Sequence, residues 1–182
     1  NFNPPKEDID NLIYLYKNAR YQDVLDKFEK MVLQYPHSIF LYNLSGSANA
    51  LLKRFDKAVE CYNKALRVKP DYAAAYNNLG NVFKEKGDKE LAIKNYKLAI
   101  KLKPNCAEYH YSLGRIYKEN NNIDLSKQSF KQAISLKSDY AEAYYGLGLT
   151  LEQNGEFRSA IKSYKSALIY NPNYPEVFFN LG

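Results

Sequence analysis

Apolar positions recur along this chain with the spacing of α-helices. In residues 73–106, the first stripe falls three, four and seven residues apart, on one face of a helix: Tyr76, Leu79, Gly80 and Phe83. A second apolar stripe runs through residues 91–102. Between the stripes, Gly87 can adopt the left-handed conformation that ends a helix, and Pro104 cannot continue the second helix. The segment therefore predicts a helical hairpin.

The same pattern returns at a fixed interval of 34 residues. A glycine marks each return: Gly46, Gly80, Gly114, Gly148 and Gly182. A fixed period of this length is typical of stacked helix pairs. Repeats are predicted at residues 5–38, 39–72, 73–106, 107–140 and 141–174, with a partial sixth at 175–182. We expect them to form a single domain, 1–182.

The recurring glycine lies inside a predicted helix, where it costs about 1 kcal/mol relative to alanine. Close contact between helices is the simplest offset. Small side chains are expected to face the glycines across each hairpin: Ala58, Ala92, Ser126 and Ala160. Larger side chains are expected to fill the gaps between layers: Tyr62, Tyr96, Phe130 and Tyr164.

These positions resemble the tetratricopeptide repeat. The matching motif is Tyr76-x-x-Leu79-Gly80-x-x-Phe83, followed by Ala92-x-x-x-Tyr96, Ala99 and Pro104. The resemblance implies an all-α fold, a right-handed α-solenoid of stacked antiparallel helix pairs. It also implies that the first helices line a concave groove, which holds an extended peptide or a helix of a partner protein. The motif residues build the hairpin, so they do not name the partner.

Both ends depart from the regular repeat. Leu12 replaces the glycine in the first repeat, as is common where a stack of repeats meets water. The sixth repeat stops inside its first helix, with Phe178 and Phe179 on an apolar edge. We expect the chain to be a fragment of a longer protein, without a linker or a second domain in these residues.

Composition narrows the classes of partner. The net charge is +6, from 26 basic and 20 acidic side chains. Lysines gather in the second helices, but arginine is scarce and acidic residues are interleaved, so a solvated face is favoured over nucleic-acid binding. No apolar run approaches about 18 residues, so we expect no membrane span. Cys61 and Cys106 fit neither a disulfide framework nor a metal pair, and a cytoplasmic location is expected.

Catalysis needs a base, nucleophile or metal held in a shaped pocket, and the sequence offers no such set. His37 and His110 are its two histidines. His110 occupies the position held in other repeats by Tyr42, Tyr76, Tyr144 and Phe178, so we expect it to pack between helices. The sequence predicts no enzymatic activity, no metal and no cofactor.

The candidate site is therefore the groove. In the first three repeats its predicted lining is Lys6, Ile9, Asp10, Ile13, Tyr16, Lys17, Phe40, Asn43, Leu44, Ser47, Ala50, Leu51, Ala74, Asn77, Asn78, Asn81, Lys84 and Glu85. The candidate peptide-binding residues are Asn43, Asn77, Asn78, Asn81, Lys84, Tyr111, Arg115, Lys118 and Tyr145. Asparagine amides both donate and accept, which suits recognition of a peptide backbone. The two tyrosines offer flat contact area, or else pack laterally between first helices.

Three functions stay open. The first is a scaffold that binds a peptide or helix of a partner protein; acidic groups outnumber basic ones in the predicted groove, which argues against an anionic polymer. The second is the substrate-recognition arm of a larger glycosyltransferase- or sulfotransferase-like enzyme whose catalytic domain is outside this chain. The third is homo-oligomerisation through the terminal helix 175–182.

Overall fold

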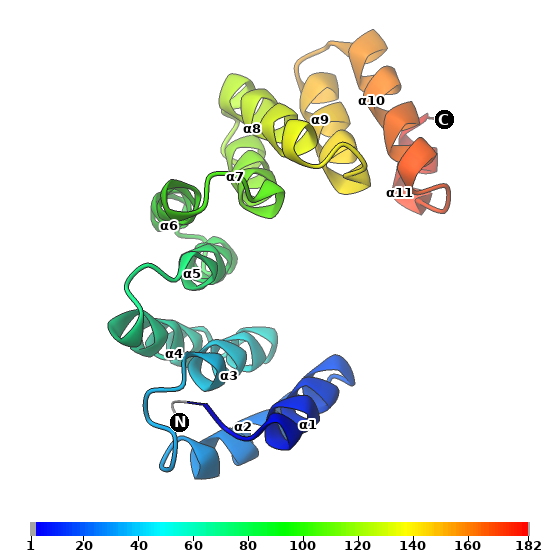
Figure 1. The fold of residues 1–182 in the computed structure, drawn as a ribbon. Helices are drawn as coiled ribbons and strands as arrows, with labels where there is room; N and C mark the ends of the chain where they lie inside the picture. The colour runs from blue at the N-terminus through cyan, green and yellow to red at the C-terminus, as the bar shows by residue number, and fades with distance from the viewer. Residues whose placement is uncertain (1–2, 182) are drawn as a thin grey trace. The chain divides into compact units, whose positions relative to one another are not determined.

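The computed structural model describes residues 3–181 and is entirely helical over that range, without a strand (Figure 1). The helices are α1 Lys6–Lys17, α2 Tyr21–Met31, α3 Ile39–Leu51, α4 Phe55–Val68, α5 Ala73–Glu85, α6 Lys89–Leu102, α7 Ala107–Glu119, α8 Ile123–Leu136, α9 Ala141–Gln153, α10 Phe157–Tyr170 and α11 Pro175–Leu181. Gly182, the last member of the glycine series, lies outside the described residues. The predicted all-α class is confirmed.

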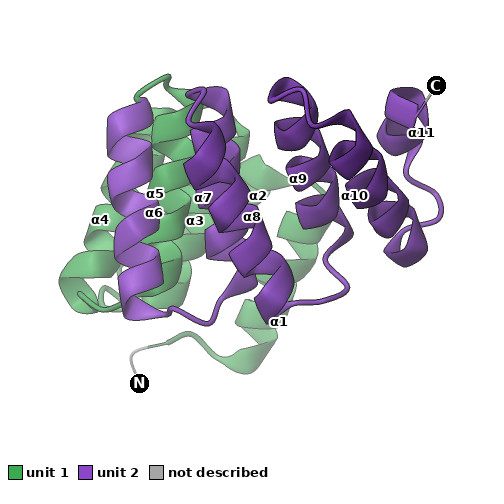
Figure 2. Ribbon diagram, turned by 90° about the horizontal axis from the view of Figure 1, so that it is seen from above, with its two compact units in different colours: residues 1–88 green, residues 89–182 purple. Residues whose placement is uncertain are grey.

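The chain forms two compact units, residues 1–88 and 89–182 (Figure 2). Unit 1 holds α1 to α5, and unit 2 holds α6 to α11. The boundary falls in the turn between the two helices of the third repeat. The prediction of a single domain is not tested by this division, because each unit keeps the same hairpin architecture.

Helix starts follow the predicted repeat boundaries. The helices α3, α5, α7, α9 and α11 begin at the first residue of the second to sixth repeats: Ile39, Ala73, Ala107, Ala141 and Pro175. Within the units, α3 packs on α4, α7 on α8, and α9 on both α8 and α10. Within each unit, helices of the same repeat and of neighbouring repeats therefore pack on one another, as the solenoid prediction requires.

The turn inside each hairpin needs one residue with positive φ, and that residue also recurs every 34 positions. Gly87 and Gly155 adopt φ of 83° and 76°. The other three turns use Ala19, Lys53 and Asn121, at φ of 57°, 58° and 56°. Side chains other than glycine are strained in this region, asparagine less than most. The turn is thus imposed by helix packing even where the local sequence does not favour it.

In three of the repeats, the glycine inside the first helix makes room for an aromatic ring from the second helix. A Cβ at Gly46 would lie 2.6 Å from Cε1 of Tyr62, and a Cβ at Gly148 would overlap Tyr164 in the same way. The Phe130 ring lies against two glycines, Gly114 of its own repeat and Gly146 of the next. The rings do fill gaps between layers, as predicted, and they also explain why the glycines cannot carry a side chain.

The small residues of the second helices complete the core. Ala58, Ala92 and Ala160 are almost fully buried. Ser126 takes the same position in the fourth repeat, where its hydroxyl donates to the Gly114 carbonyl over 2.9 Å and lies 3.0 Å from Thr150 Oγ1. A polar side chain at this position is accepted because it finds partners on both neighbouring helices.

Candidate functional site

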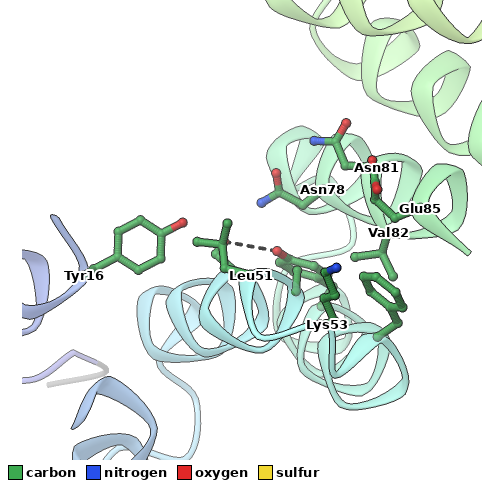
Figure 3. Close-up of a pocket in the computed structure, with 11 residues that line it drawn as sticks. Tyr16, Leu51, Lys53, Asn78, Asn81, Val82 and Glu85 are labelled. Carbon is green, nitrogen blue, oxygen red and sulfur yellow. Dashed lines mark hydrogen bonds between the residues drawn. The ribbon is translucent and has the colours of Figure 1, made fainter. Parts of the chain in front are cut away.

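A hollow of about 420 Å³ lies along the first helices of unit 1, and we call it the unit 1 groove (Figure 3). It is lined by Tyr16, Ser47, Ala50, Leu51, Lys53, Phe55, Tyr62, Asn78, Asn81, Val82 and Glu85. In Figure 3, Tyr16 of α1 lies across the hollow from Asn78 and Asn81 of α5. Three consecutive first helices therefore contribute to one surface.

Two of the predicted asparagines are joined across the groove wall. Asn78 donates its Nδ2 to the Oδ1 of Asn43 over 3.0 Å, and both side chains are half-buried. This bond holds the amide plane of Asn78 in a fixed orientation beside the hollow. Asn81, one turn further along α5, is exposed at the lining. The structure thus brings a pre-positioned amide and an accessible one together.

Asn77 has a different environment from its two neighbours. Its side chain is half-buried, and its Oδ1 has no hydrogen-bond partner within the described residues. It is absent from the lining of the unit 1 groove. The structure therefore separates Asn77 from Asn78 and Asn81, although the sequence grouped the three.

The floor of the groove carries a phenol held by a serine. The Tyr62 hydroxyl lies 3.1 Å from Ser47 Oγ, which in turn donates to the Asn43 carbonyl over 3.0 Å. Burial raises the pKa of Tyr62, so the phenol is neutral and offers a hydrogen bond rather than a charge. Burial also raises the pKa of Tyr16 on the opposite wall. The polar groups on the floor and this wall are therefore uncharged.

Charge on the lining is balanced. Lys53 and Glu85 are its two charged members, and both are exposed. The predicted candidate Lys84 is not in the lining; its Nζ pairs with Glu85 Oε1 at 2.9 Å, and its side chain is only 13% exposed. Next to them, Ala50, Leu51 and Val82 supply apolar area. The lining therefore combines apolar area with one positive and one negative side chain.

The candidates in unit 2 pack mainly against neighbouring rings. The ring centroid of Tyr111 lies 5.1 Å from that of Tyr140 and 5.8 Å from that of Phe130. The Arg115 guanidinium lies over the Tyr111 ring, 5.8 Å from its centroid. Lys118 is half-buried at the end of α7. Tyr111 therefore packs against α8 and against the residue that precedes α9.

Tyr145 makes the equivalent contacts one repeat later. Its ring centroid is 5.1 Å from that of Tyr174 and 5.8 Å from that of Tyr164. Its hydroxyl accepts a hydrogen bond of 3.4 Å from Asn180 Nδ2. Both tyrosines therefore fasten one layer of unit 2 to the next, and a role in binding stays a prediction.

His110, which the sequence assigns to packing between helices, is half-buried and contacts the junction that precedes α7. The Nε2 of His110 lies 2.8 Å from the Pro104 carbonyl. Tyr42, at the same position two repeats earlier, donates its hydroxyl to the Pro36 carbonyl over 3.1 Å. The two side chains thus contact equivalent prolines at two different junctions between repeats. Among the described residues, no group of three His, Cys, Asp or Glu side chains could hold a metal ion.

Four lining residues were missed, three of them because the prediction restricted the groove to first helices. Lys53 belongs to the turn of the second hairpin, Phe55 and Tyr62 belong to α4, and Val82 lies on the inner side of α5. The signal for Tyr62 was present in the sequence. An aromatic side chain that faces a glycine reaches past the first helix, because nothing on that helix blocks it.

Helix pairs with a lateral groove define a helical-repeat scaffold, a fold that typically carries no catalytic site. Models of the TPR repeat match residues 46–87, 80–121 and 114–155, and the model of the tetratricopeptide repeat matches residues 141–174. Together they cover most of the chain. The chain belongs to the tetratricopeptide repeat family, and its class of function is that of a protein-interaction scaffold.

Two curated relatives share part of the repeat region. A probable UDP-N-acetylglucosamine–peptide N-acetylglucosaminyltransferase of Arabidopsis thaliana is 36% identical over 76 residues, 42% of this chain and 8% of that protein. A peroxisomal targeting signal receptor of Candida albicans is 36% identical over 68 residues, 37% of this chain and 12% of that protein. The matched segments thus span a small fraction of either relative.

Solved structures show the same fold at low identity. MamA superposes with a TM-score of 0.76 at 23% identity, covering 87% of this chain and 93% of MamA. YrrB, described as a TPR protein with an unusual peptide-binding site, superposes with a TM-score of 0.72 at 18% identity, covering 94% and 89% of the two chains. Among the described residues, no helix is both long and apolar enough to cross a bilayer.

Proposed function

We propose that the unit 1 groove binds an extended, uncharged peptide segment of a partner protein. The observation that carries this is the amide pair of α5: Asn78, held by Asn43 at 3.0 Å, and Asn81, exposed at the lining. Each amide can donate to a peptide carbonyl and accept from a peptide N–H. A backbone ladder of this kind recognises an extended chain whatever its side chains are.

Side-chain selectivity comes from the rest of the lining. Ala50, Leu51 and Val82 favour small or branched apolar side chains, and the neutral hydroxyls of Tyr62 and Ser47 offer polar contacts between them. Since Lys53 and Glu85 balance, neither nucleic acid nor a strongly charged peptide is favoured. The chain acts by binding, without catalysis of its own, in the cytoplasm and away from membranes.

The test is a peptide library screened against residues 1–182, followed by fluorescence anisotropy with the selected peptide. We expect a Kd of roughly micromolar order. The double variant Asn78→Ala/Asn81→Ala is expected to weaken binding at least about tenfold, since two backbone contacts are lost. Asn63→Ala, an exposed asparagine of α4, is the matched control. Equal affinity for the double variant and the wild type would refute the groove assignment.

The recognition arm of a larger transferase is the alternative, and the match to the Arabidopsis protein is what favours it. That match covers 8% of the relative. The match does not distinguish the substrate-recognition part of an enzyme from a scaffold without a catalytic domain. The full reading frame decides between the two. A transferase domain in the same frame would support the alternative; a frame without one would end it.

Self-association through α11 is a separate proposal. Phe178 and Phe179 are 55% and 87% exposed, an apolar surface of the kind that mediates association. Phe178→Asp/Phe179→Asp is expected to convert a dimer to a monomer in light scattering. A wild-type chain that is already monomeric at high concentration would exclude this interface.

A further inference from the structure

A second hollow of about 500 Å³ lies on the opposite side of α3 from the unit 1 groove. It is bounded by α2, α3 and α4, with Leu25 and Phe28 on one wall and Ser45, Asn49 and Cys61 on the others. We call it the α2–α4 hollow. Ser45 and Asn49 share one face of α3, because residues four apart stack on a helix, whereas Ser47 and Leu51 turn to the groove.

The hollow exists because the second repeat lacks two large core side chains. At the position of Ser45, the later repeats hold Leu79, Leu113 and Leu147. At the position of Asn49, they hold Phe83, Tyr117 and Leu151. Apart from the half-buried Phe83, all of these side chains are buried in the core. Replacing both by short polar residues removes volume that the backbone of a stacked hairpin does not take up.

Asn49 leaves a hydrogen-bond acceptor open at this place. Its side chain is 4% exposed, and its Nδ2 donates to the Ser45 carbonyl over 3.0 Å and to Ser45 Oγ over 3.4 Å. Its Oδ1 is buried and has no partner within the described residues. Buried acceptors are almost always paired, so this oxygen beside the hollow would gain a hydrogen bond from a donor that reached it.

Several of the remaining polar groups on the wall are engaged, and the exposed charged side chains of Glu29 and Lys57 also line the hollow. Ser45 Oγ lies 3.5 Å from Cys61 Sγ, and burial raises the pKa of the Cys61 thiol, so no charge is present there. At the mouth, Lys64 pairs with Glu60 at 2.7 Å, and Arg54 donates to Gln22 over 3.0 Å. An occupant therefore needs an apolar body and one donor at its tip, with no net charge.

We propose that the α2–α4 hollow receives a tyrosine side chain of a partner protein. The phenol ring would lie against Leu25 and Phe28, and its hydroxyl would donate to Asn49 Oδ1. Tyr117 shows that a phenol is accommodated at the corresponding position of the fourth repeat, where it is 5% exposed. The partner side chain thus restores from outside the aromatic residue that the second repeat lacks.

The probes are N-acetyltyrosinamide and N-acetylphenylalaninamide, titrated against residues 1–182 by NMR. We expect millimolar-order binding of the tyrosine probe, at least about tenfold tighter than the phenylalanine probe, with shifts at Leu25, Phe28 and Asn49. Asn49→Ala keeps the hollow but removes the acceptor, so the preference for tyrosine should fall to about onefold.

A filling variant completes the test. Asn49→Phe places in the hollow the ring that Phe83 supplies in the third repeat, and binding of both probes should be lost. Asn49→Leu, the residue of the fifth repeat, serves the same purpose if the larger ring does not fit. Peptide affinity at the unit 1 groove should be unchanged in all three variants, which separates the two sites. Equal binding of both probes to the wild type, or undiminished binding to the filled variants, would overturn the proposal.

Discussion

Asn78 and Asn43 are 35 residues apart in sequence and are joined by a hydrogen bond of 3.0 Å between their side-chain amides. Their separation is one residue more than the repeat, so the bond runs diagonally between neighbouring first helices. The same two repeat positions are joined again in unit 2, where Asn180 donates to the Tyr145 hydroxyl over 3.4 Å. A diagonal polar contact between neighbouring first helices therefore recurs in both units. The contact between Asn43 and Asn78 borders the unit 1 groove.

Removing the hydrogen bond between Asn43 and Asn78 should lower the free energy of unfolding. The effects of the two single substitutions should not be additive. Asn43→Ala and Asn78→Ala are each expected to cost about 1 kcal/mol in the free energy of unfolding, because each leaves a half-buried amide without its partner. The double variant should cost less than the sum, with a coupling of about 1 kcal/mol. Urea unfolding followed by circular dichroism measures all four states. Strictly additive effects would show that the bond does not contribute.

The contact between Gly148 and Tyr164 predicts an unfavourable glycine-to-alanine change. Alanine is the better helix former by about 1 kcal/mol, yet its Cβ would overlap a ring that is 1% exposed and cannot move aside. Overpacking of this kind costs about 1–3 kcal/mol, so Gly148→Ala should be destabilising overall.

A second substitution separates this overlap from other effects. In the background Tyr164→Leu, where the ring is gone, Gly148→Ala should become neutral or stabilising. Thermal unfolding of the four variants provides the comparison. A Gly148→Ala protein that is more stable than the wild type would contradict the contact.

The hairpin turns predict a stabilising substitution. Ala19 has φ of 57°, where a residue with a Cβ is disfavoured by about 1–2 kcal/mol. Ala19→Gly should therefore raise the free energy of unfolding by about 1 kcal/mol, after allowing for the greater freedom of glycine in the unfolded chain. Asn121→Gly is the comparison. It should gain less, because asparagine tolerates this region and Asn121 Oδ1 accepts a 2.8 Å bond from Gln153.

Buried phenols predict a loss of stability in alkali. Burial raises the pKa of Tyr62, Tyr140 and Tyr164, and raises that of Tyr174 to about 12. In the unfolded chain these phenols ionise at about pH 10. Above that pH, the folded state therefore holds protons that the unfolded state has released. The contribution of these phenols to the free energy of unfolding should be constant below about pH 9 and fall as the pH rises toward about 12.

Urea midpoints over this pH range, with phenolate absorbance recorded in parallel, test that expectation. The absorbance change should coincide with unfolding instead of preceding it. Tyr174→Phe should make the decline shallower, since one of the perturbed groups is removed. A midpoint that does not change up to about pH 11 would contradict burial of these phenols.

Much of the fold was predictable because it is periodic. Helix starts at Ile39, Ala73 and Ala107 coincide with the predicted boundaries, since one hairpin pattern repeated at a constant interval leaves few alternative registers. The packing role expected for His110 from its position in a column of aromatic residues stays a prediction, and the structure shows its contact with the Pro104 carbonyl.

The site was predictable only in part. Asn78 and Asn81 do line a hollow, whereas Asn77 and Lys84 do not. Neighbouring residues on a helix point in directions about 100° apart, so a stretch rich in asparagine cannot by itself show which amide reaches a groove. Tyr62 was missed as a lining residue because its access depends on the absence of a side chain at Gly46.

By itself, the sequence determined the helical hairpin, its period, the places of the turns and the family, because each of these depends on short-range spacing within one repeat. Only the tertiary structure decided which polar atoms meet: the Asn43–Asn78 bond, the Tyr62 phenol on the groove floor and the unpartnered oxygen of Asn49. These depend on how one layer lies on the next to within about an ångström, the tolerance of a hydrogen bond, and a repeat pattern does not specify layer contacts that finely.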